Sequence, residues 1–380
     1  MNTKKNLLLV SFTPLSNAPR PNKQITLLKD SYHIFELAYD ASTQADRFYR
    51  VDNARKGTII QKARWLSTML YGDLHAYIER YTTSGHKELE ATPFDLVIAH
   101  DIYPCPLAFH YAKGAPIIVD LHEYLPAEMA QHWRWRLLFQ RGIVNLCRKY
   151  LPRAAATLTT SEELAKIYQK NFGISPIVNY NTPPFEQLFP TPVGDEIHIV
   201  HHGCASPSRN ILELLALMEK LQSRFHLHLY LIGSGDYYDT AKQQSLAHPR
   251  IHWHDPVPLM KISRTINQYD IGIHLLAPCN LNHDLTIGNK FFEYIQARLA
   301  IAVWPTTSMC RLLTTYKVGF ATPDTTLESM ASALNALTAE QISAFKQESH
   351  TVAPLFTAEE SMLKVQMAIQ QALSSVTAHD

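Results

Sequence analysis

The stretch GNKFFEYIQARLAIAV, residues 288–303, decides the fold class of this chain. It predicts a glycine turn, a short amphipathic helix and a buried strand, which is the repeating unit of parallel sheets covered by helices. Lys290 and Glu293 are three residues apart, so they share one face of that helix. Apolar residues at helical spacing form a second face that would pack against a sheet: Phe292, Ile295 and Leu299.

The face that carries Lys290 has the chemistry of an anion site. A helix that begins after Gly288 offers free backbone N–H groups and a positive dipole end, and the ammonium of Lys290 adds a full charge. The carboxylate of Glu293 could accept hydrogen bonds from a vicinal diol such as a ribose. A phosphate group is therefore the expected ligand. For the fragment alone, a solvated Lys290–Glu293 ion pair is the simpler interpretation.

The composition is that of an ordinary globular protein of about two domains, with 380 residues, 46% hydrophobic and 18% charged. Lys and Arg number 35 against 34 acidic residues, so no overall field points to nucleic acid, and we expect no nucleic-acid partner. The cysteines, 5 in number, form no CxxC pair, which argues against a disulfide framework or a structural zinc site. A reducing cytoplasm suits them best.

The amino-terminal segment MNTKKNLLLVSF resembles a signal peptide only superficially. Its apolar run is brief and is followed by Thr13 and Pro14, so we interpret it as the first strand. The sequence has no apolar run long enough for a membrane-spanning helix.

Short apolar runs alternate with longer amphipathic stretches, and this pattern occurs twice. It predicts an α/β protein with two doubly wound parallel sheets. Strands are expected near residues 6–12, 33–37, 95–99, 116–121, 156–159 and 176–179, and again near 198–202, 226–232, 250–254, 270–275, 300–304 and 318–321.

The proline-rich stretch NTPPFEQLFPTPVGD, residues 181–195, suits an extended connection between the two halves. We therefore expect domains over 1–182 and 183–356. Thr357 and Glu360 form a capping box, and the apolar residues after it predict a final helix over 357–380 that crosses back to the first domain.

In the second half, small residues and cations follow the predicted strands. Gly203 ends the strand HIVHHG, and Arg209 is expected in the first turn of the helix that follows. Together with Lys290 it could hold one diphosphate. Gly235, at the end of LIGSG, would let the backbone approach a ligand closely. Each turn alone would also fit a plain strand-to-helix connection.

In the first half, polar clusters end two neighbouring strands. IAHDIYP places His100 and Asp101 at one strand end, and IIVDLHEYLP places Asp120, His122 and Glu123 at the next. Histidine and carboxylate side chains at one sheet edge could perform acid/base chemistry or orient a hydroxyl group. For each residue taken singly, helix capping or packing is an equal alternative.

Taken together, these segments, from about residue 95 to 303, resemble the retaining nucleotide-sugar glycosyltransferases of the GT-B fold. That group includes glycogen synthase and bacterial polysaccharide and lipopolysaccharide transferases, the group 1 glycosyl transferases. In it, two glutamates bind the donor sugar and the ribose. Glu293 in NKFFEYIQA matches the second glutamate and Gly288 the glycine between them, but Leu285 stands at the first. Contacts to the sugar would then come from the backbone of Thr286 to Gly288 or from residues 282–284.

The resemblance extends to both halves of the site. In the family an arginine and a lysine hold the diphosphate; Arg209 stands at the lysine position, and Cys204 at the arginine position. The segment around Asp101 resembles the family's His-Asp segment, and His122 matches the family's active-site histidine. The resemblance implies catalytic roles for His122, Asp101 and Glu123. Donor-binding roles are implied for Arg209, Lys290, Glu293, Gly288, Thr286, Gly203 and Gly235.

The implied function is transfer of a sugar, with retention, from a nucleoside-diphosphate sugar to a glycan or lipid-linked glycan acceptor. Capsule, lipopolysaccharide or exopolysaccharide synthesis is the expected setting. The family generally works without a bound catalytic metal, so we expect no metal and no cofactor beyond the donor. Two alternatives stay open: a sugar-nucleotide or glycan binding module without turnover, and a nicotinamide-dependent oxidoreductase, against which the missing dinucleotide fingerprint counts.

One stretch predicts a partner surface. In residues 133–153, Arg134, Arg141 and Arg148 recur every seven residues and make a basic stripe beside apolar residues: Trp135, Leu138, Phe139 and Leu146. Such a helix could rest on anionic lipid, which would place a cytoplasmic protein at the inner face of the membrane. A core-packed helix with a solvated basic face is the simpler alternative.

Overall fold

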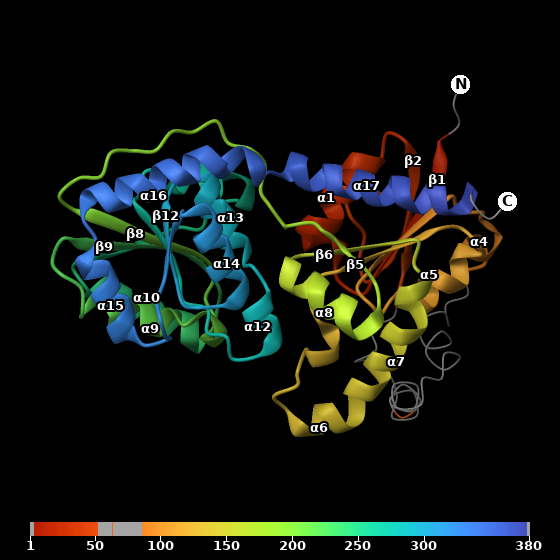
Figure 1. Ribbon diagram of the computed structural model, residues 1–380, viewed down its shortest axis with the longest axis horizontal. Coiled ribbons are helices and arrows are strands. Elements are labelled where there is room, and N and C mark those ends of the chain that lie inside the picture. Colours follow the sequence, from red (N-terminus) through yellow and green to blue (C-terminus); the bar gives the residue numbers. More distant parts are fainter. Residues whose placement is uncertain (1–3, 52–62, 64–85, 378–380) are drawn as a thin grey trace. The chain divides into compact units, whose positions relative to one another are not determined.

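The computed structural model describes residues 4–51, 63 and 86–377. They divide into two compact units. Unit 1 comprises residues 1–180, 280–282 and 362–380, and unit 2 comprises residues 181–279 and 283–361. Each unit is a parallel sheet with helices on both faces (Figure 1).

Unit 1 contains a seven-stranded sheet in the order β3-β2-β1-β4-β5-β6-β7. Its strands are β1 (Lys5–Ser11), β2 (Tyr32–Ala38), β3 (Arg47–Arg50), β4 (Leu96–His100), β5 (Ile117–Leu121), β6 (Ala156–Thr159) and β7 (Ile177–Val178). β1, β4 and β5 are nearly continuous apolar runs because helices bury both faces of a parallel sheet. The sequence did not predict β3, whose RFYR has no apolar run because it lies at the sheet edge and is mostly exposed.

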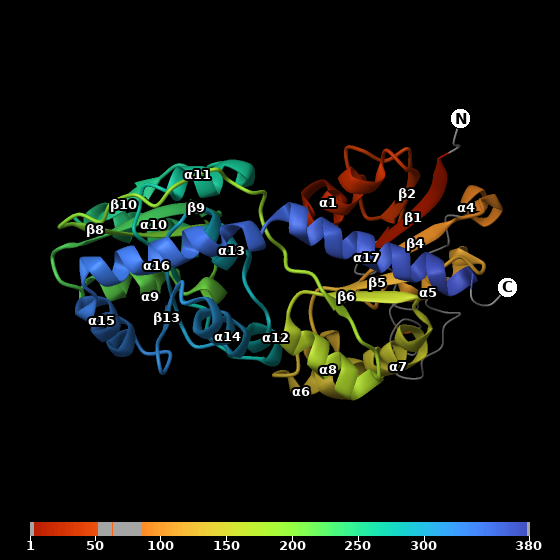
Figure 2. The same cartoon turned by 45° about the horizontal axis from the view of Figure 1, so that its top comes forward.

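Within the described residues, the helices of unit 1 include α1 (Pro19–Leu28), α4 (Lys87–Ala91), α5 (Cys105–Ala112), α6 (Trp133–Trp135), α7 (Arg141–Tyr150) and α8 (Glu162–Phe172). The last helix of the chain, α17 (Ala358–Thr377), also packs on this sheet (Figure 2). Its buried residues Val365, Ala368, Ile369 and Ala372 join the apolar side chains of β1, β4, β5 and β6. The hydroxyl of Thr357 accepts from the N–H of Glu360, as the predicted cap requires (3.1 Å).

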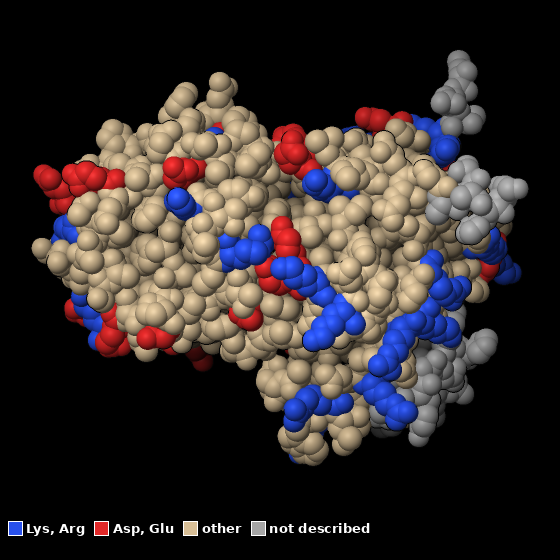
Figure 3. Space-filling model, viewed as in Figure 1, with Lys and Arg blue, Asp and Glu red and all other residues tan. Residues whose placement is uncertain are grey.

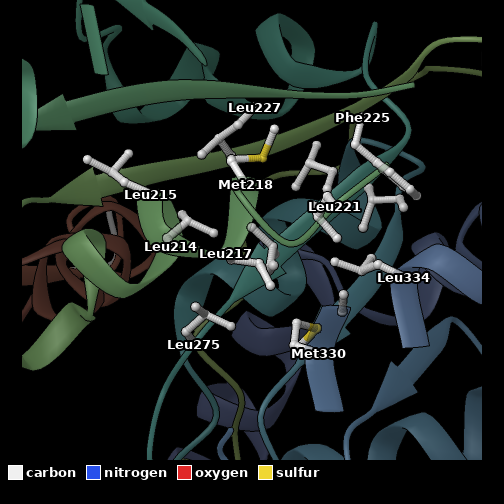
Figure 4. Close-up of a cluster of buried hydrophobic side chains, with 14 of the residues drawn as sticks. Leu214, Leu215, Leu217, Met218, Leu221, Phe225, Leu227, Leu275, Met330 and Leu334 are labelled. Atoms are coloured by element: carbon white, nitrogen blue, oxygen red, sulfur yellow. The ribbon is translucent and has the colours of Figure 1, made fainter. Parts of the chain in front are cut away.

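Unit 2 contains a six-stranded sheet in the order β10-β9-β8-β11-β12-β13. Its strands are β8 (Ile197–Cys204), β9 (Phe225–Ile232), β10 (Ile251–His254), β11 (Ile271–His274), β12 (Ala300–Val303) and β13 (Gly319–Ala321). Its helices are α9 (Ile211–Met218), α10 (Asp236–Ala247), α11 (Ile262–Ile266), α12 (Leu281–Leu285), α13 (Asn289–Gln296), α14 (Thr307–Tyr316), α15 (Leu327–Ala336) and α16 (Ala339–Val352). Residues 281 and 282 of α12 belong to unit 1. Figure 4 shows part of the apolar core, in which α9 and α15 meet the strands.

The other face of this sheet carries a histidine array, made of His198, His226, His228, His252 and His254. His228 hydrogen-bonds His198 and His254, each at 3.0 Å, and its ring stacks on Tyr269. Burial lowers the pKa of His228 to about 3, with neighbouring histidines adding to the effect. The array is thus neutral where it is most buried.

Both sheets have the doubly wound order, in which successive strands are added first on one side of the first strand and then on its other side. The reversal lies between β1 and β4 in unit 1 and between β8 and β11 in unit 2. Every predicted strand is present, and the predicted α/β class with two doubly wound sheets is confirmed. No helix of the described residues is long and apolar enough to cross a bilayer.

Candidate functional site: two polar clusters at the strand ends

In unit 2, Gly203 and Lys290 meet at the carboxyl end of β8. Gly203 has φ +114°, and a Cβ placed there would lie 2.8 Å from the Nζ of Lys290. The positive φ favours glycine, and a Cβ would displace the ammonium group from this position. Gly288, which precedes α13, lies in the same way against His274, whose Nε2 would be 3.1 Å from an added Cβ. The predicted residues Gly203, Gly288 and Lys290 are thus brought to the reversal point of the sheet.

Arg209 is placed differently from the sequence prediction. It lies in a separate 3₁₀ turn, η6 (Pro207–Arg209), and α9 begins only after Asn210, which has φ 52°. The hydroxyl of Tyr237 accepts from the N–H groups of Ile211 and Leu212 at 3.0 and 3.3 Å. The first N–H groups of α9 are therefore already satisfied, and the prediction that Arg209 lies in the first turn of that helix was wrong.

Lys290 is surrounded by charge. Burial lowers the pKa of its ammonium to about 8, and the nearby guanidinium of Arg209 adds to this effect while Glu293 opposes it. Two cations this close form a concentrated positive site, which a diphosphate would neutralise. Glu293 is buried, and its Oε2 lies 3.2 Å from Nε2 of His202, an ion-pair distance without hydrogen-bond geometry.

The sequence reasoning missed His201 and His274, which lie under this cluster. His274 ends β11 and is 1% exposed, and His201 donates from Nδ1 to the carbonyl of Ile273 (2.9 Å). Burial holds the pKa of both imidazoles far below the usual range, and the charge of Lys290 lowers it further. The signal that could have found them is a histidine at the end of each strand beside the reversal point.

The remaining residues of unit 2 that were predicted to bind the donor have no described contact with Lys290. Gly235 has φ +85° and precedes α10, on the side of β8 away from β11. The hydroxyl of Thr286 is buried without a hydrogen-bond partner among the described residues. Asp284, considered as a sugar contact, instead accepts from the N–H and hydroxyl of Thr307 at the start of α14, both at 2.8 Å.

In unit 1, Asp101 and His122 meet at the carboxyl ends of β4 and β5. Asp101 has φ 70°, an unusual conformation for a non-glycine residue, and its Oδ1 accepts from the N–H of His122 at 2.8 Å. Its other oxygen lies 3.6 Å from Nδ1 of His122. Burial raises the pKa of Asp101, although His122 opposes the shift. Nε2 of His122 lies 3.2 Å from Nδ1 of the buried His100.

Asp120 is committed to a contact that the sequence did not reveal. Arg20 of α1 donates to it from Nε (2.8 Å) and Nη2 (2.6 Å), and Gln24 donates from Nε2 (2.6 Å). Burial alone would raise the pKa of Asp120, but the guanidinium of Arg20 holds it well below the usual range. Asp120 is therefore a fixed anion that orients its neighbours, not a proton acceptor.

Glu123 points toward the first turn of α12, at Asn282, a residue of unit 1. Its Oε2 lies 3.3 Å from the donating Nδ2 of Asn282, whose Oδ1 accepts from the N–H of Tyr124 at 2.8 Å. The backbone carbonyl of Glu123 accepts from the hydroxyl of Tyr168 (2.7 Å). The structure thus joins Asp101 directly to His122, while the side chain of Glu123 is directed to Asn282.

His100, Asp120 and His122 also have ligand atoms within 4.8 Å of one another, the one such group of possible metal ligands in the described part of the chain. Both oxygens of Asp120 already accept from Arg20. A metal ion would have to share this carboxylate with a guanidinium cation, which Coulomb repulsion disfavours.

Comparison with known proteins gives the fold and a family match for part of the first unit. Residues 33–181 match the model of Glycosyltransferase Family 4. Among curated proteins, no relative matches the sequence. Among solved structures, HepE of Anabaena in complex with UDP-glucose is 14% identical, with a TM-score of 0.66, and the match covers 98% of this chain and 100% of that one.

Two further structures have the same arrangement. The sucrose-phosphate synthase of Thermosynechococcus elongatus is 12% identical over 98% of this chain and 100% of its own, with a TM-score of 0.67. WaaG, a glycosyltransferase involved in lipopolysaccharide biosynthesis, is 12% identical over 93% of this chain and 98% of its own, with a TM-score of 0.63. At these identities the structures establish the fold, and the predicted GT-B architecture is confirmed.

Proposed function

We propose that this chain, whose residues 33–181 match the model of Glycosyltransferase Family 4, is a retaining glycosyltransferase that transfers a sugar from a nucleoside-diphosphate sugar to the hydroxyl of a glycan or lipid-linked glycan. The observation that carries the proposal is the paired cation site of Arg209 and Lys290 at the reversal point of the second sheet. A diphosphate is the ligand that such a site would bind most strongly. HepE, with the same fold, binds UDP-glucose.

The proposed chemistry places most of the catalysis at the leaving group. Breaking the bond between the anomeric carbon and the phosphate leaves an oxocarbenium-like centre and adds negative charge to the diphosphate. Arg209 and Lys290 would stabilise that charge, and Gly203 would let the ammonium group sit against the backbone. Glu293 would accept from the ribose, while the backbone near Thr286, Gly288 and Gly235 would line the donor.

In unit 1, His122 would contact the donor sugar or the reacting centre. Its ring is held from one side by Asp101 and from the other by His100, which burial keeps neutral by lowering its pKa to about 3. Asp101 and Glu123 would position sugar or acceptor hydroxyls. We assign no role to a metal ion, because the guanidinium of Arg20 already occupies the carboxylate of Asp120.

A thermal-shift series tests the function. UDP-glucose, UDP-N-acetylglucosamine, GDP-mannose and ADP-glucose are each added to the full chain. Because a ligand at about 100 times its Kd stabilises the folded state by about 2.7 kcal/mol, at least one donor should raise the Tm by several degrees. If no nucleoside-diphosphate sugar changes the Tm or binds by calorimetry, the proposal fails.

The second candidate is a sugar-nucleotide binding module without turnover. It is favoured by Leu285, which is 8% exposed and stands where the family has its first glutamate. Release of nucleoside diphosphate from the donor, measured with and without cell-extracted glycan acceptors, separates the two. Tight binding with no release under either condition favours the module.

We further propose that residues 133–153 rest on an anionic membrane surface. The segment is helical throughout, and all its charged side chains are basic. Trp133 and Leu137, one turn apart, are 62% and 67% exposed, whereas Leu146 is buried. Figure 3 shows basic side chains, with few acidic ones, over the part of unit 1 that carries α6 and α7. This combination of exposed apolar and basic groups supports an interfacial role.

Vesicle sedimentation tests the membrane contact. The protein should bind vesicles of phosphatidylcholine with phosphatidylglycerol at low salt, bind less at high salt, and bind least as the Trp133→Ser/Leu137→Ser variant. Leu246→Ser, which removes an exposed leucine of α10 (67% exposed), is the matched control and should bind normally. Absence of binding by the unaltered protein at low salt rules the contact out.

A further inference from the structure

The unpaired buried groups of unit 2 gather at one place. Among the described residues of this unit, the buried side-chain atoms without a hydrogen-bond partner all come from β8, from the ends of β11 and β12, or from the loop before α13. They belong to His201, His202, His274, Thr286 and Trp304. Buried polar groups are normally paired, so a cluster of unpaired ones at a strand end indicates a site that is completed by something else.

His201 and His274 are the members that can change charge. His201 donates from Nδ1 to the carbonyl of Ile273, an acceptor only, so its Nε2 carries the free lone pair. His274 has no partner at either ring nitrogen. Both side chains are 1% exposed, and their ring centroids are 6.1 Å apart. Each therefore has one nitrogen able to receive a proton.

The two glycine contacts place these rings against the proposed diphosphate site. Nε2 of His274 lies against Gly288, two residues before Lys290, and the Nζ of Lys290 lies against Gly203, two residues after His201. Without a ligand, Lys290 and Arg209 impose a positive field on both imidazoles. The other charged or titratable groups that face the cluster are His202, Cys204, Glu293 and Tyr294, whose hydroxyl donates to the same Ile273 carbonyl as His201.

We propose that His201 and His274 each become able to accept a proton from solvent when the diphosphate of the donor binds at Lys290, so that donor binding is accompanied by proton uptake. The diphosphate carries about two negative charges, which offset the positive field of Lys290 and Arg209 and attract an imidazolium, so that they oppose the effect of burial. The imidazolium groups then act as positioning residues: they support Lys290 and add positive charge behind the leaving group. This role rests on the proposed donor site.

Calorimetry in buffers of different ionisation enthalpy measures the uptake. UDP-glucose, GDP-mannose and ADP-glucose are titrated into the full chain, and the donor that binds most tightly is used for the measurement. The diphosphate esters of these donors do not titrate near neutrality, so the donor itself takes up no proton. At about pH 6 the ammonium of Lys290 already holds its proton, since its pKa is about 8. We expect uptake of a clear fraction of a proton per bound donor at this pH. Because Lys290 is already protonated, another group must accept that proton.

Variants assign that proton. His201→Asn keeps an N–H donor for Ile273, and His274→Asn keeps a polar side chain, so the double variant should lose most of the uptake at about pH 6. His252→Asn, in the histidine array of the same sheet, is the matched control and should retain it. The kcat should fall more than KM rises in the double variant, because the added charge matters most as the leaving group departs.

The outcomes separate this inference from the proposed function. Failure of all three donors to bind counts against the function. Binding without proton uptake by the unaltered protein at about pH 6 overturns the inference even if the variants do not fold. Uptake that persists in the folded double variant overturns it as well. Uptake lost in the double variant and kept in His252→Asn supports it.

Discussion

Lys290 and Arg209 are the residues on which turnover should depend most. Loss of one preorganised charge at a leaving group costs about 3–4 kcal/mol of transition-state stabilisation. We therefore expect Lys290→Ala and Arg209→Ala each to lower kcat by about 10²- to 10³-fold with the donor saturating. Steady-state release of nucleoside diphosphate measures this. Lys261→Ala, an exposed lysine of the same unit, is the control, and unchanged turnover in Lys290→Ala would refute the assignment.

The same residue predicts how donor affinity varies with pH. The pKa of Lys290 is about 8 in the free protein, so the ammonium loses its proton as the pH rises through that value. A diphosphate binds the charged form, and its affinity should therefore fall between about pH 8 and 9. Calorimetric titrations at both values measure the change. Lys290→Arg, whose charge is retained, should remove the fall, and an equal fall in that variant would exclude Lys290 as its source.

At the scale of single elements, α1 is tied to the sheet by a buried charge pair. Arg20→Met would leave the carboxylate of Asp120, which is 0% exposed, without its guanidinium partner. Loss of one member of a buried pair typically costs 3–5 kcal/mol, so we expect a decrease of about this size in the free energy of unfolding. Urea denaturation measures it.

The control for that variant is an exposed pair in the same unit. Arg47 and Glu88 lie 3.6 Å apart with side chains 63% and 56% exposed, and Arg47→Met should change the unfolding free energy by less than about 1 kcal/mol. Similar decreases in the free energy of unfolding in the two variants would mean that burial does not determine how much the Arg20–Asp120 pair contributes to stability.

The elements also show where sequence reasoning succeeds. Strands such as β1 and β12 are continuous apolar runs followed by turn residues, so local pattern sufficed to place them. The place of Gly203 at a strand end and of Lys290 at the start of a helix could also be predicted from local pattern. β3 could not, because an exposed edge strand needs no apolar run.

Contacts between distant segments were beyond local pattern. Arg20 and Asp120 are far apart in the sequence, and nothing near Asp120 reveals its guanidinium partner. Tyr237 likewise satisfies the start of α9 from α10, which displaced the expected anion site there. Both the buried ion pair and the occupied helix end depend on tertiary packing, which a single sequence does not display.

At the scale of the whole molecule, buried histidines should make the fold sensitive to acid. The pKa of His228 and of His201 is about 3 in the folded chain, below the usual value near 6.5. Each buried neutral imidazole therefore makes its full contribution to the free energy of unfolding above about pH 6.5, and this contribution is lost as the pH falls toward 3. By pH 5 the loss is up to about 2 kcal/mol per imidazole. Urea unfolding at pH 7, 6 and 5 measures the slope.

His228→Phe keeps the stacked ring but cannot titrate, so the slope should decrease even if the variant is less stable at pH 7. His132→Asn, which removes an exposed histidine of unit 1, is the control and should leave the slope as it is. If His228→Phe leaves the slope of the unfolding free energy against pH unchanged, protonation of other groups causes the sensitivity to acid.

The packing of α17 on unit 1 also bears on the order of folding during synthesis. The apolar layer that begins with Leu7 and Leu9 is completed by Ala368, Ile369 and Ala372, which are translated only after the whole of unit 2. The amino-terminal half must therefore wait, with one side of its sheet covered only in part by α1, until α17 has left the ribosome. A nascent chain arrested before α17 would present that bare surface to chaperones, although almost all of its strands had already emerged.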